Sequence, residues 1–394
     1  MWTLHLSRYL SGDPPPRPLQ RLNAWAHQEP FDRIIFTLYW FFTLGFFAPI
    51  VAMALPWLFL FETVQQKINK NGMIQPQEEL QGAGRKTQLA VVISGCDSGI
   101  GKELAMCLAL DGFVIFAGCL KSESLDQFKT MGSSIHPILL DVTNDAQVRA
   151  FHETVQKWLS DGTEPQARQL HSLINNAGVG ISGYFDWLSL SDYEQCMNVN
   201  FFGMIRMTKA FLPTMKKEAI SGRHRYPQIV NIISLAGVTS GTGLGTSPYE
   251  ASKHAAEAFT NSLRMELKMF GIRVVALNPS FFETPLTNNV EHRFRNDVLK
   301  RMDPSCRDEY GDEFIENFVR HADTIVRSGR WNLNVLIETI VKVVKSKDPP
   351  AQLMIGVDKY GHGTFNMFPQ WVRNGLVQLA LPPQTPKILK QASC

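Results

Sequence analysis

Residues 89–101 of this chain read LAVVISGCDSGIG and decide the fold. The first five form a continuous apolar run, which is typical of a parallel strand covered on both faces. The glycines after it have the spacing Gly-x-x-x-Gly-x-Gly, and a helix-like segment follows at 102–110. Such a turn lets the backbone approach a pyrophosphate, to which the helix N-terminus adds N–H groups and partial positive charge. The residues expected to hold a dinucleotide here are Gly95, Ser98, Gly99, Ile100 and Gly101.

Strand-like and helix-like segments alternate after this turn. Further apolar runs of strand length occupy 114–117, 135–140, 173–175, 229–233, 274–277 and 353–355. Helix-like segments occupy 99–111, 144–160, 191–218 and 248–270. The alternation predicts an α/β fold, namely a doubly wound parallel sheet. It also favours a nucleotide-binding role for the glycines, which in isolation would fit an ordinary turn.

The chain becomes less regular from about residue 286. Two helices are expected, at about 308–328 and 331–346, and a stretch rich in Phe and Trp covers 365–381. These elements would suit a substrate lid and a surface element.

Polar residues follow several of the predicted strands, at the sheet edge where such folds bind ligands. Asp141 follows the third strand, and Asn176, Ala177 and Gly178 follow the fourth. We expect these four to contact the cofactor, with turn-forming Asx residues as the alternative. The second strand ends at 118–121 with no carboxylate and a late lysine, so this stretch does not decide between NAD and NADP.

Tyr249 and Lys253 are four residues apart at the start of a predicted helix, so their side chains share one face. An unperturbed tyrosine has a pKa of about 10, too high for efficient proton transfer at neutral pH. A nearby ammonium together with an oxidised nicotinamide would favour the phenolate. This chemistry predicts Tyr249 as the residue that transfers a proton.

Two further polar residues complete the predicted catalytic group. Ser234 ends the fifth strand, where its hydroxyl could bind the substrate oxygen beside Tyr249. Asn200, within 198–203, could bend a helix through its side chain and hold a water that relays protons to Lys253.

The N-terminal part is organised differently. Residues 1–33 form a polar, proline-rich tail, and 62–86 are expected to link to a catalytic domain over 87–394. Residues 34–61 contain no charged side chain and exceed the roughly 20 residues that a transmembrane helix needs. Pro49 and Pro56 leave a kinked single span and a hairpin both open. The flanking basic residues do not fix the topology.

Composition excludes several functions. A net charge of +3 without clustered basic runs argues against nucleic acid as a partner. The six cysteines lack the spacing of metal ligands, so neither a metal site nor a disulfide framework is expected.

Taken together, these motifs resemble the short-chain dehydrogenase/reductase superfamily over about residues 86–385. The resemblance implies a Rossmann-type fold, a nicotinamide cofactor and a catalytic tetrad of Asn200, Ser234, Tyr249 and Lys253. It also implies that Tyr249 and Lys253 contact the cofactor, as do Pro279 and Thr284. Ser280 replaces the usual glycine after Pro279, and the loop before Tyr249 is about two residues longer than usual.

Finer motifs resemble the branch of retinol dehydrogenases, 11β- and 17β-hydroxysteroid dehydrogenases and 3-hydroxybutyrate dehydrogenase. That branch implies NAD, a lipophilic alcohol or ketone, and a membrane, with the endoplasmic reticulum expected and mitochondria as the alternative. Phe281, Phe282 and Tyr310 are candidates for the substrate pocket. Two alternatives remain. The substrate could be a small hydroxy acid, which would need a cation in the pocket, or the protein could be a catalytically silent membrane-tethered scaffold. A homodimer through 191–218 and 248–270 is also expected from relatives.

Overall fold

The computed structural model describes residues 88–130, 134–161, 168–221, 227–241, 244–288, 290–356, 368–380 and 386–392. The predicted tail, membrane segment and linker lie outside these ranges. Within them, none of the helices combines the length and apolar character that crossing a bilayer requires. The chain separates into two compact units: of the described residues, 304–317 and those from 379 onward form one, and 88–303 with 318–378 form the other.

The larger unit is built on a seven-stranded sheet with the order β3-β2-β1-β4-β5-β6-β7. All six strand pairs are parallel. The strands are β1 (Gln88–Ser94), β2 (Val114–Cys119), β3 (Ile135–Leu139), β4 (Arg168–Asn175), β5 (Gln228–Ile232), β6 (Arg273–Pro279) and β7 (Gln352–Ile355). The predicted doubly wound sheet is therefore confirmed. Its order reverses between β1 and β4, which is where open α/β sheets bind ligands.

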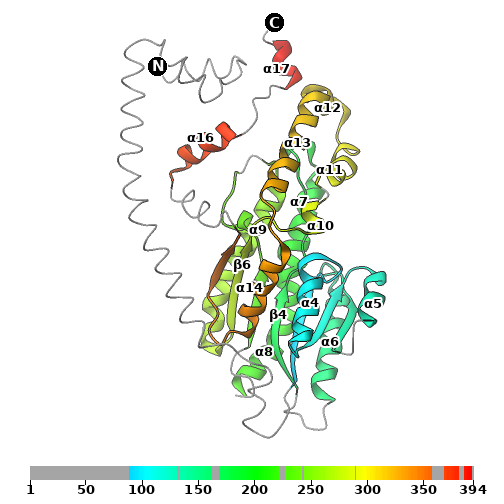
Figure 1. The fold of residues 1–394 in the computed structure, drawn as a ribbon, viewed down its shortest axis with the longest axis vertical. Helices are drawn as coiled ribbons and strands as arrows, with labels where there is room; N and C mark the ends of the chain where they lie inside the picture. The colour runs from blue at the N-terminus through cyan, green and yellow to red at the C-terminus, as the bar shows by residue number, and fades with distance from the viewer. Residues whose placement is uncertain are drawn as a thin grey trace. The chain divides into compact units, whose positions relative to one another are not determined.

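Helices cover both faces of the sheet. On one face α4 (Gly99–Leu110) and α14 (Leu333–Lys345) lie side by side (Figure 1), with α5 (Ser122–Lys129) packed into the same core. On the other face α6 (Asp145–Ser160), α8 (Gly203–Ile220) and α9 (Ser247–Leu267) form a second core. Each fully buried large apolar side chain in these cores stabilises the fold by roughly 1.5–3 kcal/mol.

Local capping explains where two of these helices begin. Asn144 precedes α6, and its side chain accepts hydrogen bonds from the backbone N–H groups of Ala146 and Gln147. Ser189 and Asp192 form a reciprocal capping box at the start of α7 (Leu190–Met197). Both caps satisfy N–H groups that have no partner within the helix.

The structure corrects two of the predicted helices. The segment 191–218 consists of α7, a π-helical turn at Asn198–Phe202 and α8. The segment 308–328 consists of α12 (Pro304–Tyr310) and α13 (Asp312–Ser328), because Gly311 between them is left-handed with φ +80°. Helix α5 was not predicted.

The remaining elements are short or lie towards the C-terminus. They are α10 (Pro285–Asn288), α11 (Val290–Arg293), a π-helical turn (Phe294–Leu299), α16 (Gln370–Ala380), α17 (Lys387–Ala392), and 3-10 turns at Phe185–Trp187, Leu235–Gly237 and Lys268–Phe270.

Candidate active site

A cavity of about 1660 Å³ opens in the larger unit, where the loops after β1, β4, β5 and β6 converge. Most of the predicted site residues line it, namely Gly95, Ser98, Gly99, Ile100, Asp141, Asn176, Ala177, Gly178, Ser234, Tyr249, Lys253, Pro279, Phe281, Phe282 and Thr284. Gly101 and Asn200 lie behind this lining. Tyr310 belongs to α12 in the smaller unit, so its role in the pocket stays a prediction.

The glycine turn needs its glycines for steric reasons. Gly95 has φ +72°, and a Cβ there would lie 2.7 Å from the Cα of Ala177. A Cβ on Gly101 would collide with the carbonyl of Gly95 and the amide of Asn176. The Asn176 amide donates to the carbonyls of Ser94, at 3.0 Å, and Gly95, at 2.9 Å, and so holds the turn against β4.

The N-terminus of α4 is suited to an anion. Ser98 is the exposed N-cap, its side chain makes no capping bond, and the first turn contains no acidic residue. The backbone N–H groups of that turn are therefore available to a ligand. Together with the close-packed glycines, this arrangement fits the pyrophosphate of a dinucleotide.

Asp97 joins the glycine turn to the end of β2, a role that we did not predict. Its carboxylate accepts hydrogen bonds from the backbone N–H groups of Leu120 and Lys121, both at 2.9 Å, and from the hydroxyl of Ser124 at 2.8 Å. Asp97 and Leu120 both line the cavity, whereas Lys121 is not among its lining residues. A negative charge is thus fixed beside the strand end that carries no carboxylate of its own.

Tyr249, Ser234 and Lys253 meet at the floor of the cavity. Ser234 lies close enough to Tyr249 for its hydroxyl to lower the pKa of Tyr249, and the Lys253 Nζ lies 5.6 Å from the centre of the Tyr249 ring. Lys253 is 4% exposed and donates to the carbonyl of Ile232 at 3.2 Å. The long loop before Tyr249 therefore leaves Ser234 in contact with it.

Burial sets the ionisation of this group in the protein alone. Desolvation raises the pKa of Tyr249, against which the hydrogen bond with Ser234 and the charge of Arg293 lower it. Desolvation also lowers the pKa of Lys253 to about 8. In the protein alone, the pKa of Tyr249 is therefore not lowered towards neutral pH. The lowering of this pKa by a positively charged nicotinamide stays a prediction.

Asn200 is held in the π-helical turn and clamps the loop after β4. Its Oδ1 accepts from the N–H of Val179 at 2.8 Å, while its Nδ2 donates to the Val179 carbonyl and to the Ser252 hydroxyl, both at 2.9 Å. Ser252 in turn donates to the carbonyl of Tyr249 at 2.7 Å. Asn200 therefore joins the loop after β4 to the segment that carries Tyr249, while its predicted role with a relay water stays a prediction. π-Helical turns often occur at functional sites.

The other predicted cofactor contacts are held by local bonds. The Asp141 carboxylate accepts from the N–H and hydroxyl of Thr143, so this residue also forms the Asx turn considered as its alternative. Thr284 bonds with Thr287 at the start of α10. Ser280 requires no left-handed backbone, since every described residue with positive φ is a glycine.

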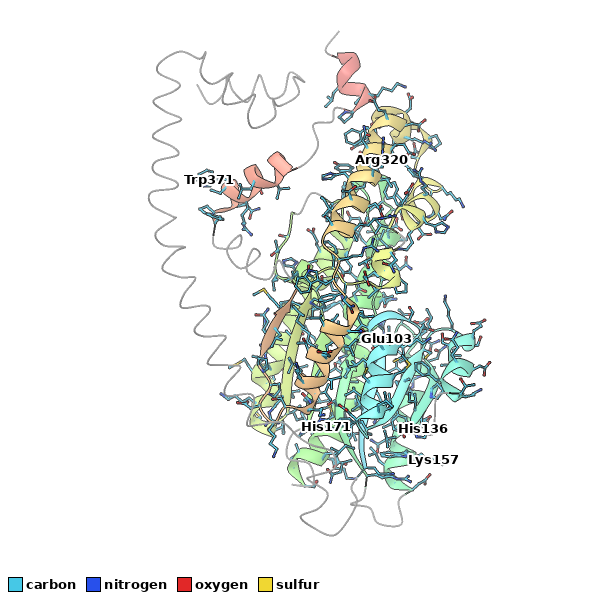
Figure 2. All side chains as sticks on the ribbon, viewed as in Figure 1. Glu103, His136, Lys157, His171, Arg320 and Trp371 are labelled. Carbon is cyan, nitrogen blue, oxygen red and sulfur yellow. The ribbon has the colours of Figure 1, made fainter. Side chains whose placement is uncertain are left out.

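None of the residues described as lining this cavity is a histidine. His136 and His171, labelled in Figure 2, lie on β3 and β4, and burial lowers the pKa of His171 to about 4. The described residues also contain no cluster of three potential metal ligands.

Comparison with known proteins identifies the family. The family model for short chain dehydrogenases matches residues 89–294, which include the glycine turn and the Tyr249/Lys253 pair. The chain is a short-chain dehydrogenase. The resemblance that the motifs indicated is thereby confirmed.

Individual relatives agree with this family. The short-chain dehydrogenase is 36% identical to retinol dehydrogenase 5 of Mus musculus over 234 residues, which cover 58% of this chain and 68% of that protein. It is 31% identical to 17-beta-hydroxysteroid dehydrogenase type 6 of Bos taurus over 271 residues, covering 68% and 80%. A solved short chain dehydrogenase/reductase from Burkholderia phymatum, in complex with NAD, shares the fold with a TM-score of 0.55 and 22% identity, covering 76% and 98%.

The pocket of this short-chain dehydrogenase departs from its prediction in two ways. The ring of Phe282 is 2% exposed and packs in the core with α14, so it contributes little to the cavity wall. Arg293 at the end of α11 lines the cavity, although sequence reasoning assigned no arginine to it. Nothing in the irregular sequence of 286–300 signals that this side chain turns inward.

Proposed function

We propose that this short-chain dehydrogenase transfers a hydride between NAD(H) and a lipophilic alcohol or ketone of the retinol or hydroxysteroid type, with Tyr249 as general acid/base. The observation that carries the proposal is the placement of Tyr249 and Ser234 close together on the wall of a large cavity, with the buried Lys253 beside the Tyr249 ring. Two neighbouring hydroxyls can bind one substrate oxygen between them.

Each residue has a distinct part in the proposed reaction. In the oxidative direction Tyr249, as phenolate, removes the alcohol proton while Ser234 donates a hydrogen bond to the oxygen. Lys253 holds the ribose beside the nicotinamide and stabilises the phenolate. Asn200 positions Tyr249 through Ser252. The bound nicotinamide supplies the hydride acceptor.

The cofactor site fits NAD(H). The glycine turn and the uncapped N-terminus of α4 would hold the pyrophosphate. Asp97 places a carboxylate at the end of β2, where a ribose hydroxyl can be hydrogen-bonded and a 2′-phosphate would be repelled. This charge supports NAD over NADP.

The cavity and the N-terminal sequence support a lipid substrate. Apolar side chains contribute to the cavity wall, among them Leu244, Leu286, Val290, Ile325 and Val326. The charge-free segment 34–61 supports a membrane anchor, with the endoplasmic reticulum as the proposed membrane. Pairing of two copies through α8 and α9 stays a prediction.

One observation favours a hydroxy acid as the second candidate substrate. That reaction needs a cation to pair with a carboxylate, and Arg293 provides one in the cavity. The scaffold alternative has less support, because the catalytic tetrad and the glycine turn are intact and assembled.

The test is turnover by the detergent-solubilised full chain, followed by formation of the reduced cofactor with NAD and with NADP. The panel contains all-trans-retinol, 3-, 11- and 17-hydroxysteroids and 3-hydroxybutyrate. Turnover of one lipid class with NAD is the expected result. Turnover of 3-hydroxybutyrate alone would favour the second candidate, and failure to bind either dinucleotide would favour the scaffold.

A further inference from the structure

Arg293 is a cation of the substrate cavity without an ion-pair partner. Its Nη1 donates to the carbonyl of Gly180 at 3.4 Å, and its Nη2 donates to the carbonyl of Leu286. Its Nε is buried and has no hydrogen-bond partner. Both acceptors are neutral carbonyls, so the positive charge has no counter-ion among the described residues.

Neighbouring arginines show the contrast. Arg295 pairs with Glu291 at 3.0 Å, Arg301 pairs with Asp192 at 2.8 Å, and Arg206, also on the cavity wall, pairs with Asp145 at 3.1 Å. Burial lowers the pKa of Arg293, and the charge of Asp297 opposes this shift, but Arg293 and Asp297 form no ion pair. A partly desolvated charge without an ion-pair partner lowers the stability of the fold. Because the Arg293 charge lies at a binding cavity, we expect a bound anion to neutralise it.

Arg293 also lies close to the reacting group. Gly180 separates the two: its carbonyl accepts from Arg293, and a Cβ built on it would lie 3.9 Å from the Tyr249 ring. The Arg293 charge accordingly lowers the pKa of Tyr249. An anion bound by Arg293 would therefore be only a few bonds from an oxygen held by Tyr249 and Ser234.

We propose that Arg293 binds the carboxylate of the substrate, and that the substrate is a lipid hydroxy acid, or the matching oxo acid, with its acid group a few bonds from the reacting carbon. The inference rests on the proposed hydride transfer and, for its substrate, develops the second candidate, a hydroxy acid, rather than the retinol or hydroxysteroid type. Arginine suits this task because its planar guanidinium can bind a carboxylate through two parallel hydrogen bonds. The apolar wall around Leu286 and Val290 would contact the hydrocarbon tail.

The experiment compares 3-hydroxytetradecanoate with its methyl ester, which has the same carbinol and tail but no charge. For each we would measure kcat/KM with NAD, and binding through the shift in thermal unfolding of the full chain in detergent with NADH. The variants are Arg293→Gln, Arg293→Lys and, as a surface control, Arg295→Gln. The wild type is expected to prefer the acid at least about tenfold.

Arg293→Gln should lower kcat/KM for the acid at least about tenfold more than for the ester, whose smaller loss reflects the effect of the charge on Tyr249, and Arg293→Lys should retain part of the preference. The control should behave as the wild type. Equal use of acid and ester by the wild type, or an equal loss for both in Arg293→Gln, would overturn the inference. Arg293-dependent binding of the acid, without turnover of it or of any alcohol in the panel, would instead retain the carboxylate site and refute the proposed oxidoreductase function.

Discussion

The buried charge of Lys253 should lower the free energy of unfolding of the protein. Its side chain is 4% exposed and burial lowers its pKa from 10.5 to about 8, so holding the charge at pH 7 costs about 3 kcal/mol. Replacing it in Lys253→Met removes this cost. The variant also leaves the Ile232 carbonyl without its hydrogen bond, which costs roughly 1 kcal/mol. We therefore expect a net gain of about 2 kcal/mol at pH 7, together with loss of turnover.

The stabilisation by Lys253→Met should depend on pH, between the pKa of Lys253 in the folded chain and its pKa in the unfolded chain. Between pH 8 and 10.5 the unfolded chain binds more protons at this lysine than the folded chain, so the wild type gains stability as pH rises through that window. At pH 9.5 the cost of the charge falls to about 1 kcal/mol, which the lost hydrogen bond offsets. The stabilisation by Lys253→Met should consequently vanish there.

The assay is thermal unfolding of the full chain in detergent, without dinucleotide, at pH 7 and pH 9.5. A gain of about 2 kcal/mol corresponds to a rise in Tm of roughly 4 °C at pH 7. Lys342→Met, which removes an exposed lysine from α14, serves as the control and should change little. A lower Tm for Lys253→Met at pH 7, or the same shift at both pH values, would refute the reasoning.

Three further variants test other parts of the site. Asn200→Ala releases both backbone groups of Val179, and steady-state kinetics should show kcat at least about tenfold lower with little change in dinucleotide Kd. Asp97→Asn removes the charge at the adenosine end, so the ratio of kcat/KM for NADP to that for NAD should rise about tenfold. Gly101→Ala forces a methyl group against the Gly95 carbonyl, and a fluorescence titration should show dinucleotide binding weakened at least about tenfold. Unchanged values would contradict the respective roles.

Much of the fold could be predicted because its signals are local. Each of the seven strands contains residues of a predicted run, and the glycine turn stands directly between a strand and a helix. The same holds for Tyr249 and Lys253, which share a helix face through their spacing alone. Ser234 followed from its place after β5.

Other features depend on contacts between distant segments, which no periodic pattern reveals. Asp97 bonds with the backbone 23 and 24 residues later, and in the sequence it is only one polar residue of a turn. Arg293 faces Gly180 across 113 residues, on a segment without regular periodicity. The interruption of the helix at Gly311 had a local signal, since glycine commonly ends helices in the left-handed conformation.

The proposed reaction depends most directly on Tyr249 as the proton-transferring residue. We would compare turnover by wild type and Tyr249→Phe with the best substrate of the panel, and measure dinucleotide Kd for both. Removing one hydroxyl that bonds with Ser234 should leave the Kd within about threefold and lower kcat by at least about a hundredfold. Turnover by Tyr249→Phe close to that of the wild type would contradict the proton transfer by Tyr249.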